Sequence, residues 1–143
     1  MVRIQSSQIQ NLQQMEVVVS GPEDANKLIV IDGQFDCNLA AIATSNVVVT
    51  IKETFSVLVG PTFTRKQFVQ ANATASIAKA RAGVTPGGFA DWNINNVDAD
   101  WDDESGQVEL RIEAQVDAFA ASQTALILGF LFHVTILAAV PTA

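Results

Sequence analysis

Residues 108–118 read VELRIEAQVDA, and this stretch decides the fold class of the chain. Aliphatic side chains occupy every even position from Val108 to Ala118, and charged or amide side chains occupy every position between them. A helix with its period of about 3.6 residues would spread those charges around its circumference, whereas successive residues of a strand point to opposite faces. The stretch therefore predicts a β-strand with one buried and one solvated face.

The same alternation continues on the N-terminal side of this stretch. Residues 27–40 and 46–59 carry their apolar side chains at odd positions and most of their polar side chains at even ones. Residues 89–102 form a further predicted strand, and the turn 102–106 leads from it into the strand at Val108. A bulge near Asn95 and Asn96 would bring the apolar residues of the 89–102 strand onto one core face: Trp92, Ile94, Val97, Ala99 and Trp101.

Residues 64–82 fit two interpretations. Thr64 and Gln67 have the spacing of a capping box, and Gly83 could end an Ala-rich helix. However, apolar residues at odd positions from Val69 to Ile77 alternate with Asn, Thr and Ser, which are poor residues for a helix interior. We favour a strand with a frame shift near Ala78, where a bulge would allow it.

The last predicted strand, 126–136, is apolar on both faces. Its even positions are all bulky, and its odd positions include Gly129, Leu131, His133 and Thr135. An antiparallel strand with one solvated face should carry polar residues at alternate positions, so we expect both faces to be covered. We expect a second subunit on the odd face, and the alternative is a second layer of the same chain.

These segments and a weaker strand at 15–19 predict an all-β chain. We expect a single domain over residues 1–143, built as an antiparallel β-sandwich or partly closed barrel of about six to seven strands.

Composition limits the partners. The 143 residues carry a net charge of −7, and the eight Lys and Arg residues are scattered, which argues against nucleic acid and against an anionic membrane surface. We expect a soluble protein, cytoplasmic unless a signal peptide has been removed. Cys37 is the only cysteine, so no intramolecular disulfide or cysteine metal cage is expected, and we interpret it as a small core residue.

No residue pattern predicts catalysis. His133 is the only histidine and lies within the most apolar segment. A buried or interfacial histidine fits this position better than a general base that activates a nucleophile. No glycine loop with a following lysine is present to hold a phosphate. We therefore expect no enzymatic activity.

The acidic run near residue 100 raises one ligand hypothesis. Asp98, Asp100, Asp102 and Glu109 have the spacing of positions one, three, five and twelve of a calcium loop, but Asp103 stands where that loop needs glycine. We interpret the run as a solvated turn. The alternative is a weak calcium site at Asp100, Asp102, Asp103 and Glu104, and no other cofactor is expected. Trp101 is a candidate sugar platform, although the parity of the strand favours the core.

The function expected from the sequence is a non-enzymatic, self-associating structural or binding subunit that forms homo-oligomers. The candidate interface residues are Gly129, Leu131, His133 and Thr135. The first alternative is a calcium-dependent or carbohydrate-binding β-sandwich module, and the second is a β-barrel carrier of an apolar small molecule.

Overall fold

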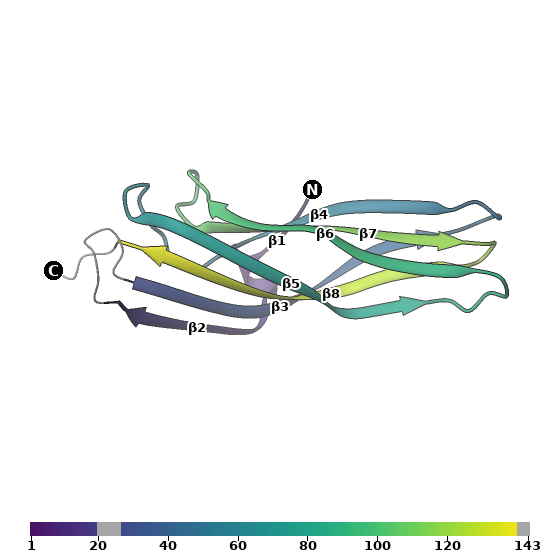
Figure 1. The fold of residues 1–143 in the computed structure, drawn as a ribbon, viewed down its shortest axis with the longest axis horizontal. Coiled ribbons are helices and arrows are strands. Elements are labelled where there is room, and N and C mark those ends of the chain that lie inside the picture. The colour runs from purple at the N-terminus through teal and green to yellow at the C-terminus, as the bar shows by residue number, and fades with distance from the viewer. Residues whose placement is uncertain (20–26, 140–143) are drawn as a thin grey trace.

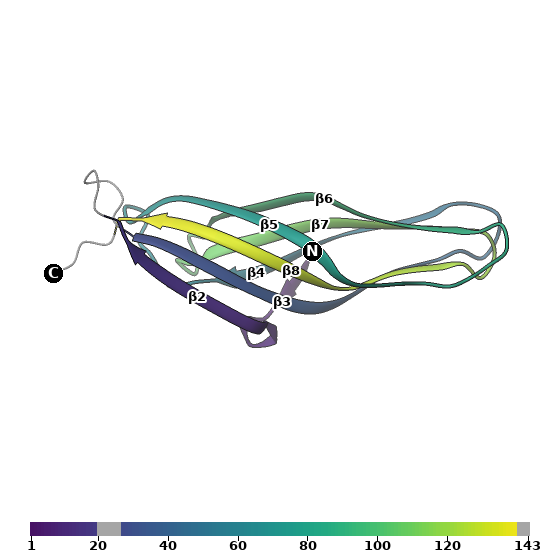
Figure 2. The same ribbon diagram turned by 60° about the horizontal axis from the view of Figure 1, so that its bottom comes forward.

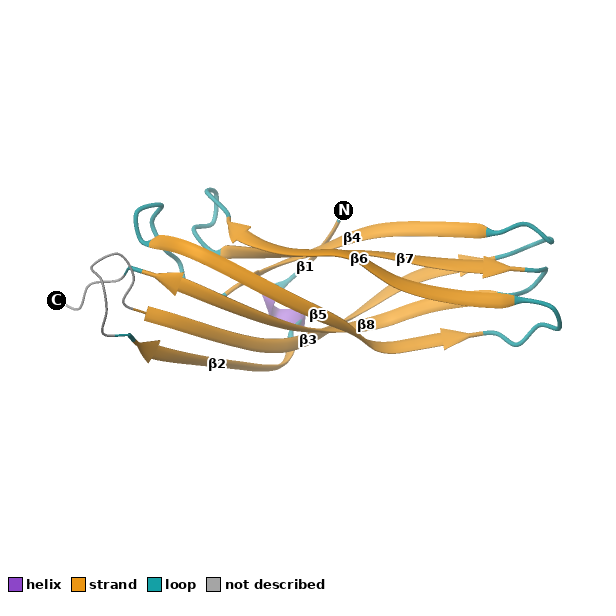
Figure 3. Cartoon of the chain, in the orientation of Figure 1, coloured by secondary structure: helices purple, strands orange, loops and turns teal. Residues whose placement is uncertain are grey.

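The structure is a computed structural model that describes residues 1–19 and 27–139. These residues are almost entirely β-strand, with one short 3-10 helix, η1 (Ser6–Gln8) (Figure 3). The strands are β1 (Val2–Ile4), β2 (Gln10–Val18), β3 (Lys27–Ile42), β4 (Val49–Val59), β5 (Phe68–Ala82), β6 (Phe89–Trp101), β7 (Val108–Phe119) and β8 (Thr124–Ala138). The all-β prediction is confirmed, and the strand not anticipated from the sequence is the short β1. No helix in the described part of the chain is long and apolar enough to cross a membrane.

The strands form two sheets of four. Sheet 1 has the order β1-β4-β7-β6, and sheet 2 has the order β2-β3-β8-β5. Figure 1 shows the long, twisted strands running the length of the molecule in two layers, with loops gathered at both ends. Pairing is antiparallel as expected, except that β1 lies parallel to β4, with Val2 opposite Phe55. This correction follows from the long connection through β2 and β3, because only short connections require antiparallel neighbours.

One cluster of buried side chains joins the two sheets. The ring of Phe55 in sheet 1 lies 6.4 Å from Phe35 and 5.5 Å from Phe130, both in sheet 2. The even residues of β7 that defined the sequence pattern, from Val108 to Ala118, are all fully buried. The interpretation of residues 108–118 as a strand with one core face is confirmed.

The two uncertain segments form strands with irregular register. Residues 68–82 form β5, and its pairing with β8 shifts next to Lys79, so the strand and the predicted frame shift are both confirmed. The Thr64 and Gln67 pair closes a turn instead of a helix, with the Thr64 N–H donating to Gln67 Oε1 at 2.8 Å. The β6–β7 pairing skips Asn95, as the parity of the apolar residues required.

Strand β8 corrects the predicted faces of residues 126–136. Its pairing with β3 shifts between Asp36 and Leu39, opposite Leu128. As a result Ile127 points into the core before this irregularity, whereas Phe130, Phe132, Val134 and Ile136 do so after it. The bulky even positions therefore do not share one face, because Leu128 is an extra residue of β8 in its pairing with β5, between Lys79 and Ala80, and this bulge reverses the alternation of side chains. Leu131, a candidate interface residue, is 44% exposed on the outer face of sheet 2.

The aromatic cluster sets the first prediction. Phe130→Ala removes a fully buried ring that contacts Phe35 and Phe55, so it should lower the free energy of unfolding by about 3–5 kcal/mol. The matched control is Phe89→Ala, because Phe89 is 48% exposed and stacks only on Phe119 in the described aromatic pairs. The control should cost about 1 kcal/mol. Urea unfolding measures both, and equal losses would contradict the assignment of Phe130 to the centre of the core.

Candidate functional site

Strand β2 forms an exposed rim of sheet 2. All nine of its residues are exposed, on both faces, whereas every other long strand has partly or fully buried positions. In Figure 2 the strand lies along the border of the molecule, beyond β3. Met15 is 61% exposed, Val18 71% and Leu12 51%. Edge strands leave a row of backbone N–H and C=O groups unpaired, so this strand offers both hydrogen bonds and apolar surface.

The other sheet borders carry charges. Strand β5 bears Lys79 and Arg81, and β6 bears Asp91, Asp98 and Asp100. Such charges are the usual protection of an edge against pairing with another chain. Strand β2 holds one charged residue, Glu16, whose carboxylate lies 3.7 Å from Lys27 Nζ on the neighbouring strand. The exposed rim is therefore close to electrically neutral.

A groove of about 510 Å³ crosses sheet 2 near its middle. Its lining includes Gln13 of β2, Asp32 and Gln34 of β3, Thr74 and Ser76 of β5, and Leu131 and His133 of β8. Two of the four predicted interface residues, Leu131 and His133, thus lie in one depression of the sheet surface. Polar side chains from all four strands of the sheet meet there.

His133 is held between two partners on the sheet surface. Its Nδ1 lies 2.6 Å from Asp32 Oδ1, and its Nε2 lies 3.1 Å from Thr135 Oγ1. The connectivity acid–imidazole–hydroxyl is that of a catalytic triad. Strand β8 pairs with β3 on one side and with β5 on the other along this stretch, so the backbone N–H groups of β8 beside the ring are used within the sheet. The contacts fix the orientation of the ring.

Gly129 lies beneath an ion pair that spans β8. Asp36 of β3 and Lys79 of β5 both stand opposite Gly129, and Lys79 Nζ reaches Asp36 Oδ1 at 3.1 Å. A Cβ at Gly129 would lie 3.1 Å from the Phe35 carbonyl oxygen and 3.4 Å from Asp36 Oδ1. The missing side chain thus leaves room for this pair. Asp36 also accepts a hydrogen bond from Gln10 Nε2 at 2.9 Å, which links the start of β2 to the rest of the sheet.

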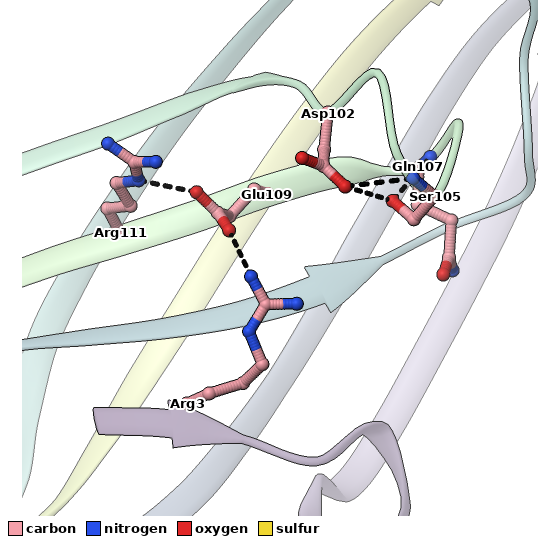
Figure 4. A network of polar contacts seen from close by, with 6 residues as sticks. All are labelled: Arg3, Asp102, Ser105, Gln107, Glu109 and Arg111. Carbon is pink, nitrogen blue, oxygen red and sulfur yellow. Dashed lines mark hydrogen bonds and ion pairs between the residues drawn. The ribbon is translucent and has the colours of Figure 1, made fainter. Parts of the chain in front are cut away.

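The residues of the calcium hypothesis lie at the β6–β7 turn (Figure 4). The Asp102 carboxylate accepts hydrogen bonds from the N–H and the hydroxyl of Ser105, and these bonds lower the pKa of Asp102. Asp103 and Glu104 are exposed, and Asp100 lies opposite Glu109. No group of three or more potential metal-binding side chains is found within residues 1–19 and 27–139.

Glu109 is the buried polar centre of this end of sheet 1. Its two carboxylate oxygens pair with Arg3 of β1, at 2.8 Å, and with Arg111 of β7 (Figure 4). Because both oxygens have a guanidinium partner, the carboxylate serves to attach β1 to the sheet.

Trp101 packs against the core beside this turn. Its indole N–H donates to the carbonyl oxygens of Phe63 and Gly106 at 3.0 and 3.1 Å. An indole whose polar atom is used internally and whose ring is partly buried against the core fits the core interpretation better than the sugar platform.

Cys37 packs against the core at the irregular part of β3. Burial, followed by the charge of Asp36, raises the pKa of its thiol to about 11. A thiol with so high a pKa holds little thiolate at neutral pH, which agrees with the structural interpretation.

Sequence reasoning found part of this surface. It selected Gly129, Leu131, His133 and Thr135: Leu131 and His133 line the groove, Thr135 contacts His133, and Gly129 is buried. It missed Asp32 and Lys79, whose partners are 101 and 43 residues away in the chain. It also missed β2 as a rim, although residues 12–18, LQQMEVV, carry apolar residues at both parities and almost no charge.

Comparison of the chain with protein-family models, curated proteins and solved structures finds no match.

The Asp36 contacts give a second prediction. Hydrogen bonds from Gln10 and Lys79 lower the pKa of Asp36 below its ordinary value of 3.8. Gln10→Met and Lys79→Met should each raise that pKa toward 3.8, as followed by NMR titration of the carboxyl carbon. Lys66→Met, at an exposed lysine of the β4–β5 loop, is the control and should leave the titration unchanged.

The sign of the linked stability follows from this direction. A lowered pKa in the folded state stabilises the fold above the unfolded-state pKa, and the contribution is lost as the pH falls through the folded-state value. Lowering the pH through the folded-state pKa of Asp36 should therefore lower the free energy of unfolding more in the original chain than in Gln10→Met. An Asp36 pKa that is equal in all variants would contradict the network.

Proposed function

We propose that this protein is a non-enzymatic structural subunit that assembles with copies of itself through strand β2. In this proposal the two sheets form a β-sandwich that acts as one domain. The groove on sheet 2 and its Asp32–His133 pair border the assembly surface.

The observation that carries the proposal is the complete exposure of β2. Leu12, Met15, Val17 and Val18 leave large apolar side chains in water on a single strand. Full burial of one such side chain contributes about 1.5–3 kcal/mol, so covering several of them drives association. Scattered apolar residues are common on protein surfaces, whereas an edge strand that combines apolar side chains on both faces with unpaired backbone groups is typical of an interaction site.

Electrostatics supports the choice of this surface for a chain with a net charge of −7. The outer side of sheet 1 concentrates acidic side chains, and Asp91 even stands directly opposite Asp117. Two copies meeting through that side would repel each other. The rim formed by β2 adds only Glu16, which is paired with Lys27, so copies approach there at the lowest electrostatic cost.

The alternative functions have weaker support. A carrier of apolar molecules needs an unfilled interior, whereas the rings of Phe35, Phe55, Phe130 and Phe132 occupy the space between the sheets. A calcium module needs converging free carboxylates, whereas Asp102 bonds to Ser105 and Glu109 pairs with two arginines.

The test is the mass in solution by size-exclusion chromatography with light scattering over a range of protein concentrations. We expect a discrete oligomer. Val17→Glu should weaken the assembly about tenfold or more in dissociation constant, because it loses at least 1.4 kcal/mol of apolar burial and adds like charges. The matched control is Ile42→Glu, at another strongly exposed aliphatic residue of sheet 2, and should leave the mass unchanged. A monomer at every concentration would overturn the proposal.

Removal of calcium tests the first alternative separately. A bound ligand at 100 times its dissociation constant stabilises a protein by about 2.7 kcal/mol. We expect the melting temperature and the mass of the assembly to be equal in calcium and in excess chelator. A fall in melting temperature with chelator would instead favour the calcium-dependent module.

A further inference from the structure

We infer that β2 pairs antiparallel with β2 of a second copy about a two-fold axis at Met15, which joins two copies of sheet 2 into one eight-stranded sheet. This inference rests on the proposed self-assembly and specifies its geometry.

The length of regular strand limits where the pairing can be centred. The register of β2 with β3 is irregular between Gln10 and Gln13 and regular from Gln13 to Val18. The positive φ of Asn11, 53°, lies in this irregular part. Residues 13–18 are thus available for a straight ladder on the free side, and Met15 and Glu16 are the two central residues of that segment.

Antiparallel geometry requires one residue to face its own copy. Residues of a strand alternate between those that direct N–H and C=O to one side and those that direct them to the other. Opposite residues in an antiparallel pair belong to the same class, so their numbers sum to an even value when the two strands are identical. In a two-fold pairing the residue at half that sum therefore lies on the axis.

The side chains of β2 complement themselves when Met15 is on the axis. Met15 faces Met15 of the second copy, and Gln13 faces Val17. Glu16 faces Gln14, an amide that can donate to its carboxylate. By contrast, an axis at Glu16 sets two carboxylates opposite each other, and an axis at Gln14 sets Glu16 opposite Leu12, both of which are unfavourable.

Two copies fit together better through their β2 strands than through the other borders of their sheets. The borders formed by β5 and β6 have opposite charges, so a contact between β5 of one copy and β6 of the next is the competing arrangement. That contact would join the copies through ion pairs, whereas the β2 pairing joins them through backbone hydrogen bonds and apolar side chains and is closed at two copies. Ion pairs between exposed residues are also screened by salt, and apolar burial is not.

A cysteine scan tests the axis directly. In a Cys37→Ala background, single cysteines replace Gln13, Gln14, Met15, Glu16 and Val17, and mild oxidation is followed by non-reducing gel electrophoresis. At the axis, the Cα atoms of the two copies are about 4.5–5.5 Å apart, within the range of a disulfide. Gln14 and Glu16 would lie about 8 Å from their own copies and beyond that range.

We expect Met15→Cys to give mostly covalent dimer and the neighbouring positions to give little. An equal mixture of Gln13→Cys and Val17→Cys proteins should form the mixed dimer, because these residues face each other about the same axis. Hydrogen exchange gives an independent measurement: alternate amides of β2 should be protected at high protein concentration and lose protection on dilution. The assembly should persist in 1 M NaCl.

The outcomes separate the two proposals. A discrete oligomer without a Met15→Cys dimer overturns the pairing about Met15, and assembly through β2 stands if Val17→Glu still weakens that oligomer. An oligomer that dissociates in 1 M NaCl overturns the apolar β2 contact in both proposals. A monomer at all concentrations overturns both. A Met15→Cys dimer together with the Gln13–Val17 mixed dimer supports both.

Discussion

The packing of Phe55 against Phe35 and Phe130 is the contact on which the two sheets depend. Each ring comes from a different strand: Phe35 from β3, Phe55 from β4 and Phe130 from β8. Because protein interiors are close-packed, this cluster fixes how far apart the sheets lie.

The irregular register near Asp36 and Leu128 decides what those surfaces carry. On one side of it Ile127 points inward, and on the other side Phe130 does. The change of frame keeps both halves of β8 in contact with the core. It also places Gly129 where Asp36 and Lys79 can meet across β8. The same strand thus supplies core residues and a polar outer band that links β2, β3 and β5.

The two sheets differ in the charge of their outer faces and in the side chains of their edge strands. Sheet 1 shows acidic side chains outward and anchors β1 through the Arg3–Glu109 pair. Sheet 2 ends in β2, which is hydrogen-bonded to β3 on one side and bears aliphatic residues on both faces. A sheet that is protected by charge on one border and left apolar on the other suits growth by addition of a further strand at that border.

The sequence alone determined that the chain is all-β and which residues of β7 face the core, because the alternation of side chains with period two is a local property. It also located the irregular positions near Asn95 and Ala78, since the apolar frame changes there. Only the tertiary structure decided the partners of His133 and Asp36 and the exposure of β2. These depend on which strands become neighbours and on where a sheet ends, and such pairings join residues far apart in the chain. Local pattern carries no information about that choice.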